Sequence, residues 1–145
     1  MEATYRQLWP GLVRLARLLS GSQALAEDLA QEVFVGLLQA GKVDHPEASL
    51  RRSVVNLATN SRRRVRRERL HLASIRETVV GEPSVDGLWP LIVQLSPRQR
   101  AVVVLRHYLD LSEADTAAVM GCRPGTAKAY LSKALAHLRK EADQP

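Results

Sequence analysis

Five polar side chains near the C-terminal end are spaced as a helix that binds DNA would require. Three of them are cationic, and arginine and lysine donate hydrogen bonds both to phosphates and to base edges. A helix that begins near Pro124 would place them on one face, opposite an apolar face. This recognition set consists of Arg123, Thr126, Lys128, Ser132 and Lys133.

The stretch before the recognition set predicts two more short helices. Ser96 is a suitable N-cap with Pro97 at the first helical position, and Ser112 gives a second helix start. Gly121 can end that second helix, because glycine enters the left-handed conformation at little cost. The pattern predicts a helix-turn-helix, whose second helix lies in the major groove of DNA. It also fits a helical hairpin with a solvated basic face, so the rest of the chain has to decide.

A second cationic set falls in the middle of the chain, on a helix expected from about Pro46 towards Leu70. Residues 51–69 contain eight arginines and one glutamate, a local charge of +7, whereas the whole chain carries +6. Cations gathered on one side of a helix with asparagines between them favour phosphate contact over a solvated face. This basic stripe consists of Arg52, Asn56, Asn60, Arg63 and Arg67.

An acidic face is expected on the helix from about Gln23 to Gln39. Asp28 and Glu32 are like charges four residues apart, which costs an isolated helix about 0.2–0.5 kcal/mol. The residues alone favour a solvated surface stabilised by the helix dipole, and a docking surface for a basic partner is the alternative. The acidic face consists of Glu27, Asp28, Gln31 and Glu32.

We expect an all-α protein of two small helical bundles joined by a flexible linker, the second bundle containing the helix-turn-helix. The chain has 145 residues, of which 46% are hydrophobic and only 4% aromatic, a mixture that favours helices. We expect the bundles at residues 5–73 and 84–142. The linker is expected at 74–83, where the helical period is lost among glycine and proline.

Several classes of function are not expected. The single cysteine, Cys122, permits no internal disulfide and fits a reducing cytoplasm, where we expect the protein to reside. The four histidines have no metal-ligand spacing, so we expect neither a metal nor another cofactor. No segment predicts a signal peptide or membrane insertion. No catalytic arrangement is apparent, and we do not expect an enzyme.

Four quoted stretches resemble one family. Leu25–Phe34 (LAEDLAQEVF), Pro46–Arg69 with its LRRSVVNL segment, Leu95–Ala101 (LSPRQRA) and Gly121–Lys128 (GCRPGTAK) are similar to bacterial RNA polymerase sigma factors of the extracytoplasmic-function type. In that type only conserved regions two and four remain. The resemblance covers nearly the whole chain in the right order. A stand-alone helix-turn-helix regulator is the rival interpretation, and a nucleic-acid-modifying enzyme is a weaker third.

The resemblance implies a role for each set of residues. The acidic face would bind core RNA polymerase, the basic stripe would contact and open the −10 promoter element, and the recognition set would read the −35 element. The loop before the basic stripe, with Lys42 and Asp44, would capture an extruded base. The implied partners are core RNA polymerase, promoter DNA and, as an option, an anti-sigma factor. The chain departs from the family at Ser49, Thr116 and the pair Ala129–Tyr130.

Overall fold

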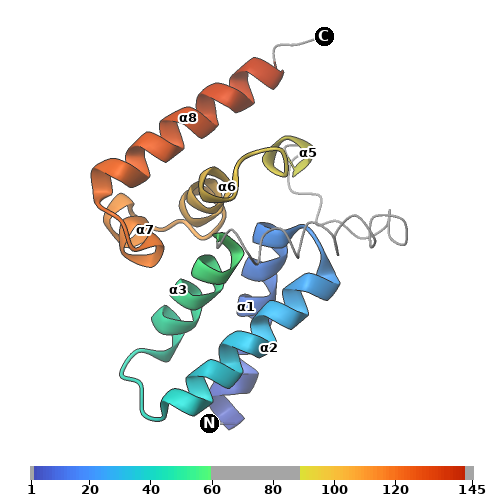
Figure 1. The fold of residues 1–145 in the computed structure, drawn as a ribbon, viewed down its shortest axis with the longest axis vertical. Helices are drawn as coiled ribbons and strands as arrows, with labels where there is room; N and C mark the ends of the chain where they lie inside the picture. Colours follow the sequence, from blue (N-terminus) through green and yellow to red (C-terminus); the bar gives the residue numbers. More distant parts are fainter. Residues whose placement is uncertain (1, 60–88, 143–145) are drawn as a thin grey trace. The chain divides into compact units, whose positions relative to one another are not determined.

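The computed structural model describes residues 2–59 and 89–142, and these residues form helices and turns without a strand (Figure 1). This confirms the all-α prediction. The chain divides into two compact units, residues 1–74 and 75–145. The predicted linker at 74–83, the bundle limits at 73 and 84, and the expected continuation of the middle helix towards Leu70 lie outside the described residues.

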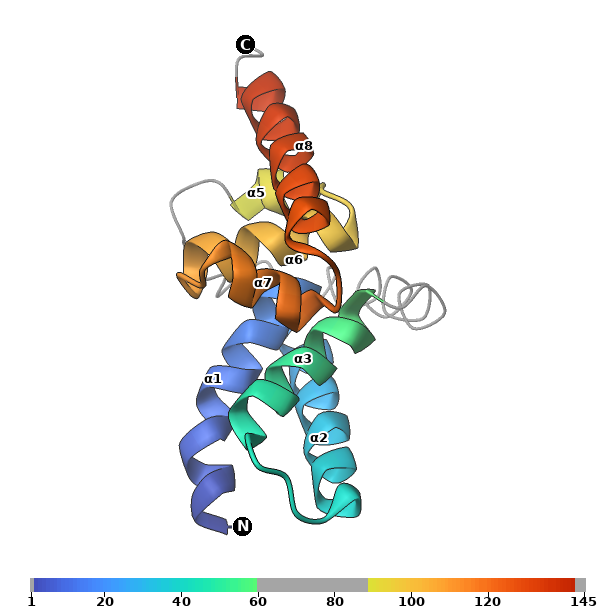
Figure 2. The same ribbon diagram turned by 90° about the vertical axis from the view of Figure 1, so that its left-hand side faces the viewer.

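The first unit is a bundle of three helices. These are α1 (Glu2–Ser20), α2 (Gln23–Ala40) and α3 (Pro46–Thr59), and every pair of them is in contact. Within this unit α2 runs opposite to α1 and α3 (Figure 2). Ser22 caps α2, because its side chain accepts a hydrogen bond from the backbone N–H of Leu25 at 3.3 Å. The predicted helix over 23–39 is therefore nearly correct.

The core of the first unit is aliphatic. On α3, Val54 and Val55 are both buried, whereas Leu57 is half-buried. Helix α3 packs against both α1 and α2, so its buried face is wider than a single stripe. The buried aliphatic side chains other than alanine are Leu12, Leu15, Leu18, Leu19, Leu25, Leu29, Val33, Leu37, Leu50, Val54 and Val55.

An aromatic cluster fastens the start of α1 to α2. Tyr5 and Trp9 stack with ring centroids 5.1 Å apart, and both contact Phe34, at 4.9 and 5.8 Å. Such ring pairs contribute about 0.5–1.5 kcal/mol beyond the area they bury. Helix α1 begins at Glu2 and continues through Pro10, whose missing N–H removes one backbone hydrogen bond from the helix. The aromatic contacts hold the turns that precede the proline.

The second unit contains five helical segments. They are α5 (Trp89–Ile92), α6 (Pro97–Val103), the π-helix η1 (Val104–Tyr108), α7 (Glu113–Met120) and α8 (Pro124–Ala142). Helix α8 contacts α5, α6 and α7 (Figure 1). Helix α7, the turn after it and α8 form the predicted helix-turn-helix.

The ends of these helices follow the predicted signals. Ser96 and Gln99 form a reciprocal capping box at the start of α6. Ser112 caps α7 by accepting a hydrogen bond from the backbone N–H of Asp115 at 3.0 Å. Gly121 ends α7 in the left-handed conformation, with φ 69°.

The segment between α6 and α7 was not predicted in detail. It continues α6 as the π-helix η1, which contains one residue more per hydrogen-bonded turn than an α-helix. Asp110 then takes a positive φ of 55°. Arg106 donates from Nη1 to the carbonyl of Leu111 at 2.6 Å, across the turn that leads into α7. This hydrogen bond fixes the direction in which the chain enters the helix-turn-helix.

The core of the second unit includes one polar side chain. Thr116 is fully buried, with 0% of its surface exposed, and its hydroxyl has no hydrogen-bond partner within the described part of the chain. The hydrophobic side chains buried around this unit's interior are Ile92, Leu95, Ala101, Val102, Val103, Val104, Leu105, Ala117, Val119, Met120, Ala127, Ala134 and Leu138.

Candidate functional site

The acidic face lies on the solvent side of α2. Its four residues, defined above, are all exposed, as a docking surface requires. Gln23 donates to Glu27 at 3.0 Å, which steadies the first turn of the helix. None of the carboxylates lies in the first turn of α2, so the helix dipole stabilises them little. Their exposure to solvent keeps the repulsion between them small.

Two apolar residues that the sequence analysis did not single out extend this face along α2. Val35 and Leu38 are 51% and 55% exposed. Both follow the acidic residues at helical spacing, and Val35 lies one turn beyond Gln31 on the same side. The surface of α2 is therefore acidic in its first half and apolar in its second. The signal in the sequence was an excess of apolar residues: α2 has more of them than one buried stripe can hold.

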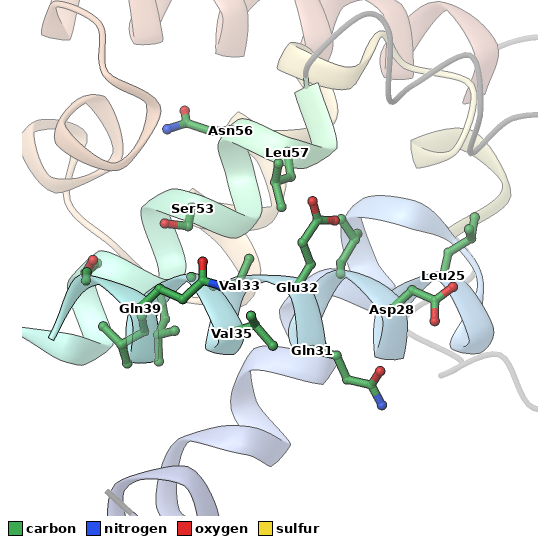
Figure 3. Close-up of a pocket in the computed structure, with 16 residues that line it drawn as sticks. Leu25, Asp28, Gln31, Glu32, Val33, Val35, Gln39, Ser53, Asn56 and Leu57 are labelled. Atoms are coloured by element: carbon green, nitrogen blue, oxygen red, sulfur yellow. The ribbon is translucent and has the colours of Figure 1, made fainter.

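A groove of about 1010 Å³ runs along the surface where α2 packs against α3. Asp28, Glu32 and Val35 line the wall formed by α2, and Asn56 and Leu57 line the wall formed by α3. Figure 3 shows Glu32 and Leu57 on these facing walls. Gln31 also lines the groove, so three residues of the acidic face and Asn56 of the basic stripe border the same depression in the surface.

The basic stripe is only partly within the described residues. Arg52 and Asn56 are exposed on α3, one turn apart. The neighbouring Arg51 is half-buried and pairs with Glu47 at 3.1 Å, so its guanidinium is engaged within the protein. The other three members of the stripe, Asn60, Arg63 and Arg67, lie outside the described residues.

The loop that precedes α3 borders a small pocket. Lys42 and Asp44 are both exposed, and Asp44 lines a pocket of about 530 Å³ together with Gln7 and Leu8 of α1 and the start of α3. The pocket is lined by polar and charged side chains from Gln7, Asp44, His45, Glu47 and Arg51, and by the apolar Leu8, Pro46 and Ala48. It therefore offers hydrogen-bond donors, acceptors and apolar surface beside the loop.

The recognition set lies at the N-terminal half of α8 and in the turn before it. Its five residues are all exposed, and the opposite side of the helix is buried through Ala127, Ala134 and Leu138. Gly125, in the first turn, has open space where a Cβ would stand. The outer surface of α8 is therefore cationic, free of bulky apolar groups and available to a polyanion.

Residues 2–59 and 89–142 contain no group of three or more histidine, cysteine or acidic side chains that could hold a metal ion. Among the helices of those same ranges, none is long and apolar enough to cross a membrane.

Comparison with known proteins places both units in one family. Residues 4–68 match the family model for sigma-70 region 2, and residues 88–138 match the model for sigma-70 region 4. The two matches fall on the two units in the order that the sequence analysis expected.

Individual relatives agree with the family models. The chain is 35% identical to the RNA polymerase sigma-E factor of Streptomyces avermitilis over 154 residues, covering 98% of the chain and 84% of that protein. It is 32% identical to the sigma-E factor of Streptomyces coelicolor, covering 97% and 84%. The solved structure of the sigma factor RpoE from Bartonella quintana, in complex with the anti-sigma factor NepR, has the same fold. Its TM-score is 0.68 at 21% identity, and the match covers 99% of this chain and 98% of that one.

Proposed function

The chain belongs to the extracytoplasmic-function sigma factors, which bind core RNA polymerase and direct promoter-specific initiation, and we propose that it divides this work between its two units. The first unit binds polymerase and opens the −10 element. The second unit reads the −35 element. The polymerase supplies the chemistry of transcription, and this chain has no catalytic role. The stand-alone regulator is set aside, because the relatives that match the whole chain are sigma factors.

The polymerase contact is the outer surface of α2. The observation that supports it is the exposed acidic face followed on the same helix by Val35 and Leu38. The acids would steer and orient a basic partner, and the apolar residues would be covered when that partner docks. This combination explains why exposed apolar side chains are tolerated on α2.

The experiment that tests this contact is a binding titration of fluorescently labelled chain with core RNA polymerase. The variant Asp28→Lys/Glu32→Lys should bind at least tenfold more weakly, because two charges are reversed and the net charge at the contact changes by four units. Glu113→Lys/Asp115→Lys makes the same change of charge on α7 and should retain affinity. Equal loss in both variants would mean that net charge is responsible, and unchanged binding by the first would move the contact elsewhere.

The −10 contact comprises the loop before α3 and the basic stripe. We place the extruded base in the pocket beside Asp44, and the phosphates of the melted strand along Arg52, Asn56 and the stripe residues beyond them. Unstacking a base costs a few kcal/mol, which specific contacts in a pocket can offset. The exposure of Arg52 supports this role.

Two adjacent arginines provide the test of the −10 contact. Arg52→Gln should reduce promoter opening, measured as permanganate reactivity of thymines in the −10 region. Arg51→Gln removes the same charge from the residue that is paired with Glu47, and should have a smaller effect. Arg63→Glu should impair opening further. Normal opening by both Arg52→Gln and Arg63→Glu would remove the stripe from the proposal.

An anti-sigma factor is a further partner that we propose for this chain. The Bartonella sigma factor of the same fold was solved with such a protein bound. A partner of this class should compete with core RNA polymerase for the chain. A competition titration would test it, and simultaneous binding of both proteins would contradict it.

A further inference from the structure

The exposed side of α8 carries cations well beyond the recognition set. Arg139 and Lys140 lie in the last turn of the helix, and both are exposed. From Thr116 to Lys140 the sequence contains five lysines and arginines and no acidic residue. The cationic surface of α8 therefore extends from its first turns to its last.

Helical geometry sorts these cations into two rows. Lys128 and Arg139 are about three turns apart and lie within about 20° of each other around the axis. Lys133 and Lys140 are about two turns apart and are aligned equally well, about 120° away from the first row. The buried residues of α8 lie on the other side. Two cation rows thus flank the centre of the outward face.

The residues between the rows are small. Gly125, Ala129, Ser132 and Ala136 occupy the centre of the exposed face, and all four are solvent-exposed. A surface with a low centre and cationic edges matches a major groove, whose floor is formed by base edges and whose two rims are lined with phosphates. The small residues leave room for close approach, and the rows supply the charge.

The length of α8 determines how it can bind. Its 19 residues span about 28 Å, whereas the major groove is about 12 Å wide. A helix that entered only by its N-terminus would leave Arg139 and Lys140 about 15 Å or more from the groove floor. A helix that lies along the groove brings Arg139, from one row, and Lys140, from the other, to opposite rims at its C-terminal end.

We propose that α8 lies lengthwise on the DNA, with Arg139 and Lys140 contacting phosphates on opposite rims of the groove beyond the bases read by the recognition set. This inference rests on the proposed role of the second unit at the −35 element. It adds two contacts that set affinity and orientation without reading sequence. The ordinary explanation is different: cations in the last turn stabilise a helix through its dipole.

The test uses holoenzyme assembled from the full-length chain and core RNA polymerase. A promoter fragment is first selected from a randomised library by the wild-type holoenzyme. Binding of that duplex is then measured over a series of potassium chloride concentrations. Each phosphate contact contributes about 0.9 to the slope of log affinity against log salt. Arg139→Gln/Lys140→Gln should therefore lower the slope by about 1.8. Between 50 and 200 mM salt, wild-type affinity should fall about twelvefold more than that of the variant.

Matched variants separate charge from helix stability. Arg139→Lys/Lys140→Arg keeps both charges and should retain the wild-type slope. Arg14→Gln/Arg98→Gln removes two exposed cations from α1 and α6 and should not change it. The ratio of affinities for the selected and a scrambled −35 element should stay constant in Arg139→Gln/Lys140→Gln, whereas Lys128→Gln should reduce that ratio.

Three results would overturn the inference. An unchanged slope in Arg139→Gln/Lys140→Gln, with or without a lower melting temperature, would assign the two cations to the helix dipole alone. Weaker binding of that variant to core polymerase without DNA would assign them to the polymerase. An altered −35 preference would mean that they read bases. Failure of the proposed function looks different, because the wild-type holoenzyme would then select no promoter.

Discussion

At the scale of single residues, the hydroxyl of Thr116 lowers the stability of the folded protein. Its hydroxyl is buried in the second unit and finds no hydrogen-bond partner among the described residues. A buried unsatisfied polar group costs about 1–3 kcal/mol. Thr116→Val keeps the shape and removes the hydroxyl, so it should raise the free energy of unfolding by about 1–2 kcal/mol in a urea titration followed by circular dichroism.

Thr126 is the matched control for this prediction. It is exposed on α8, so Thr126→Val should leave stability within about 0.5 kcal/mol of wild type. A loss of stability in Thr116→Val would mean that the hydroxyl is bonded in solution, for instance to a buried water.

Leu38 provides a second prediction at this scale. Because it is 55% exposed, Leu38→Ser should barely change stability. If a partner covers it, the substitution should weaken binding to core polymerase about fivefold, since the newly buried area is worth about 1 kcal/mol. This loss should persist at high salt, whereas the loss caused by Asp28→Lys/Glu32→Lys should shrink. Unchanged affinity for the Leu38→Ser variant would confine the contact to the acids.

At the scale of elements, two glycines four residues apart should respond in opposite directions to the same change. Gly121 has φ 69°, where an alanine costs about 1–2 kcal/mol. Gly125 lies in the first turn of α8 with open space at its Cβ position, so alanine there should be neutral or add up to about 1 kcal/mol. Thermal unfolding of Gly121→Ala and Gly125→Ala measures both. If both variants were less stable than wild type, the packing of the turn would require glycine, and the positive φ of Gly121 would not be the reason.

The helix ends were predictable because short-range chemistry determines them. The capping residues bond to groups within four residues of their own position, so the residue type alone predicts the cap. These residues are Ser96, Ser112 and Gly121. The recognition set could be placed on one exposed face for the same reason, since helical spacing is a local property. Whether those side chains contact DNA depends on a partner and stays a prediction.

Features that depend on packing could not be read from spacing. The long first helix needs Tyr5 and Trp9 to meet Phe34, a contact between residues about 30 positions apart. The π-helix η1 leaves no pattern of apolar residues in the sequence that would distinguish it from an α-helix. The groove between α2 and α3 arises from the way two helices diverge, so no single segment indicates it. The exposure of Val35 and Leu38 could not be predicted either, because the spacing of apolar residues does not show which of them a bundle leaves uncovered.

At the scale of the whole molecule, the two units should be separable in function. All members of the acidic face and both exposed apolar residues of α2 belong to the first unit, which has its own core. A fragment of residues 1–74 should therefore fold as a helical bundle and displace the full-length chain from core polymerase. The fragment 75–145 should not compete for that contact.

Competition measured by fluorescence anisotropy checks this division, with circular dichroism to establish that each fragment is helical. The Asp28→Lys/Glu32→Lys version of the 1–74 fragment is the control and should not compete. A helical wild-type 1–74 fragment that fails to displace the full-length chain would show that polymerase binding needs both units.

The burial pattern of α8 has a consequence for engineering. Ala127, Ala134 and Leu138 are its buried side chains, and four small residues occupy the middle of its outward face. The residues that pack α8 against its unit and the residues that can contact a promoter are therefore at different positions of one helix. An exchange of the outward positions as a cassette, with the three buried residues kept, should give a chain that retains its fold while addressing another promoter. Such a chain could serve as an orthogonal transcription switch.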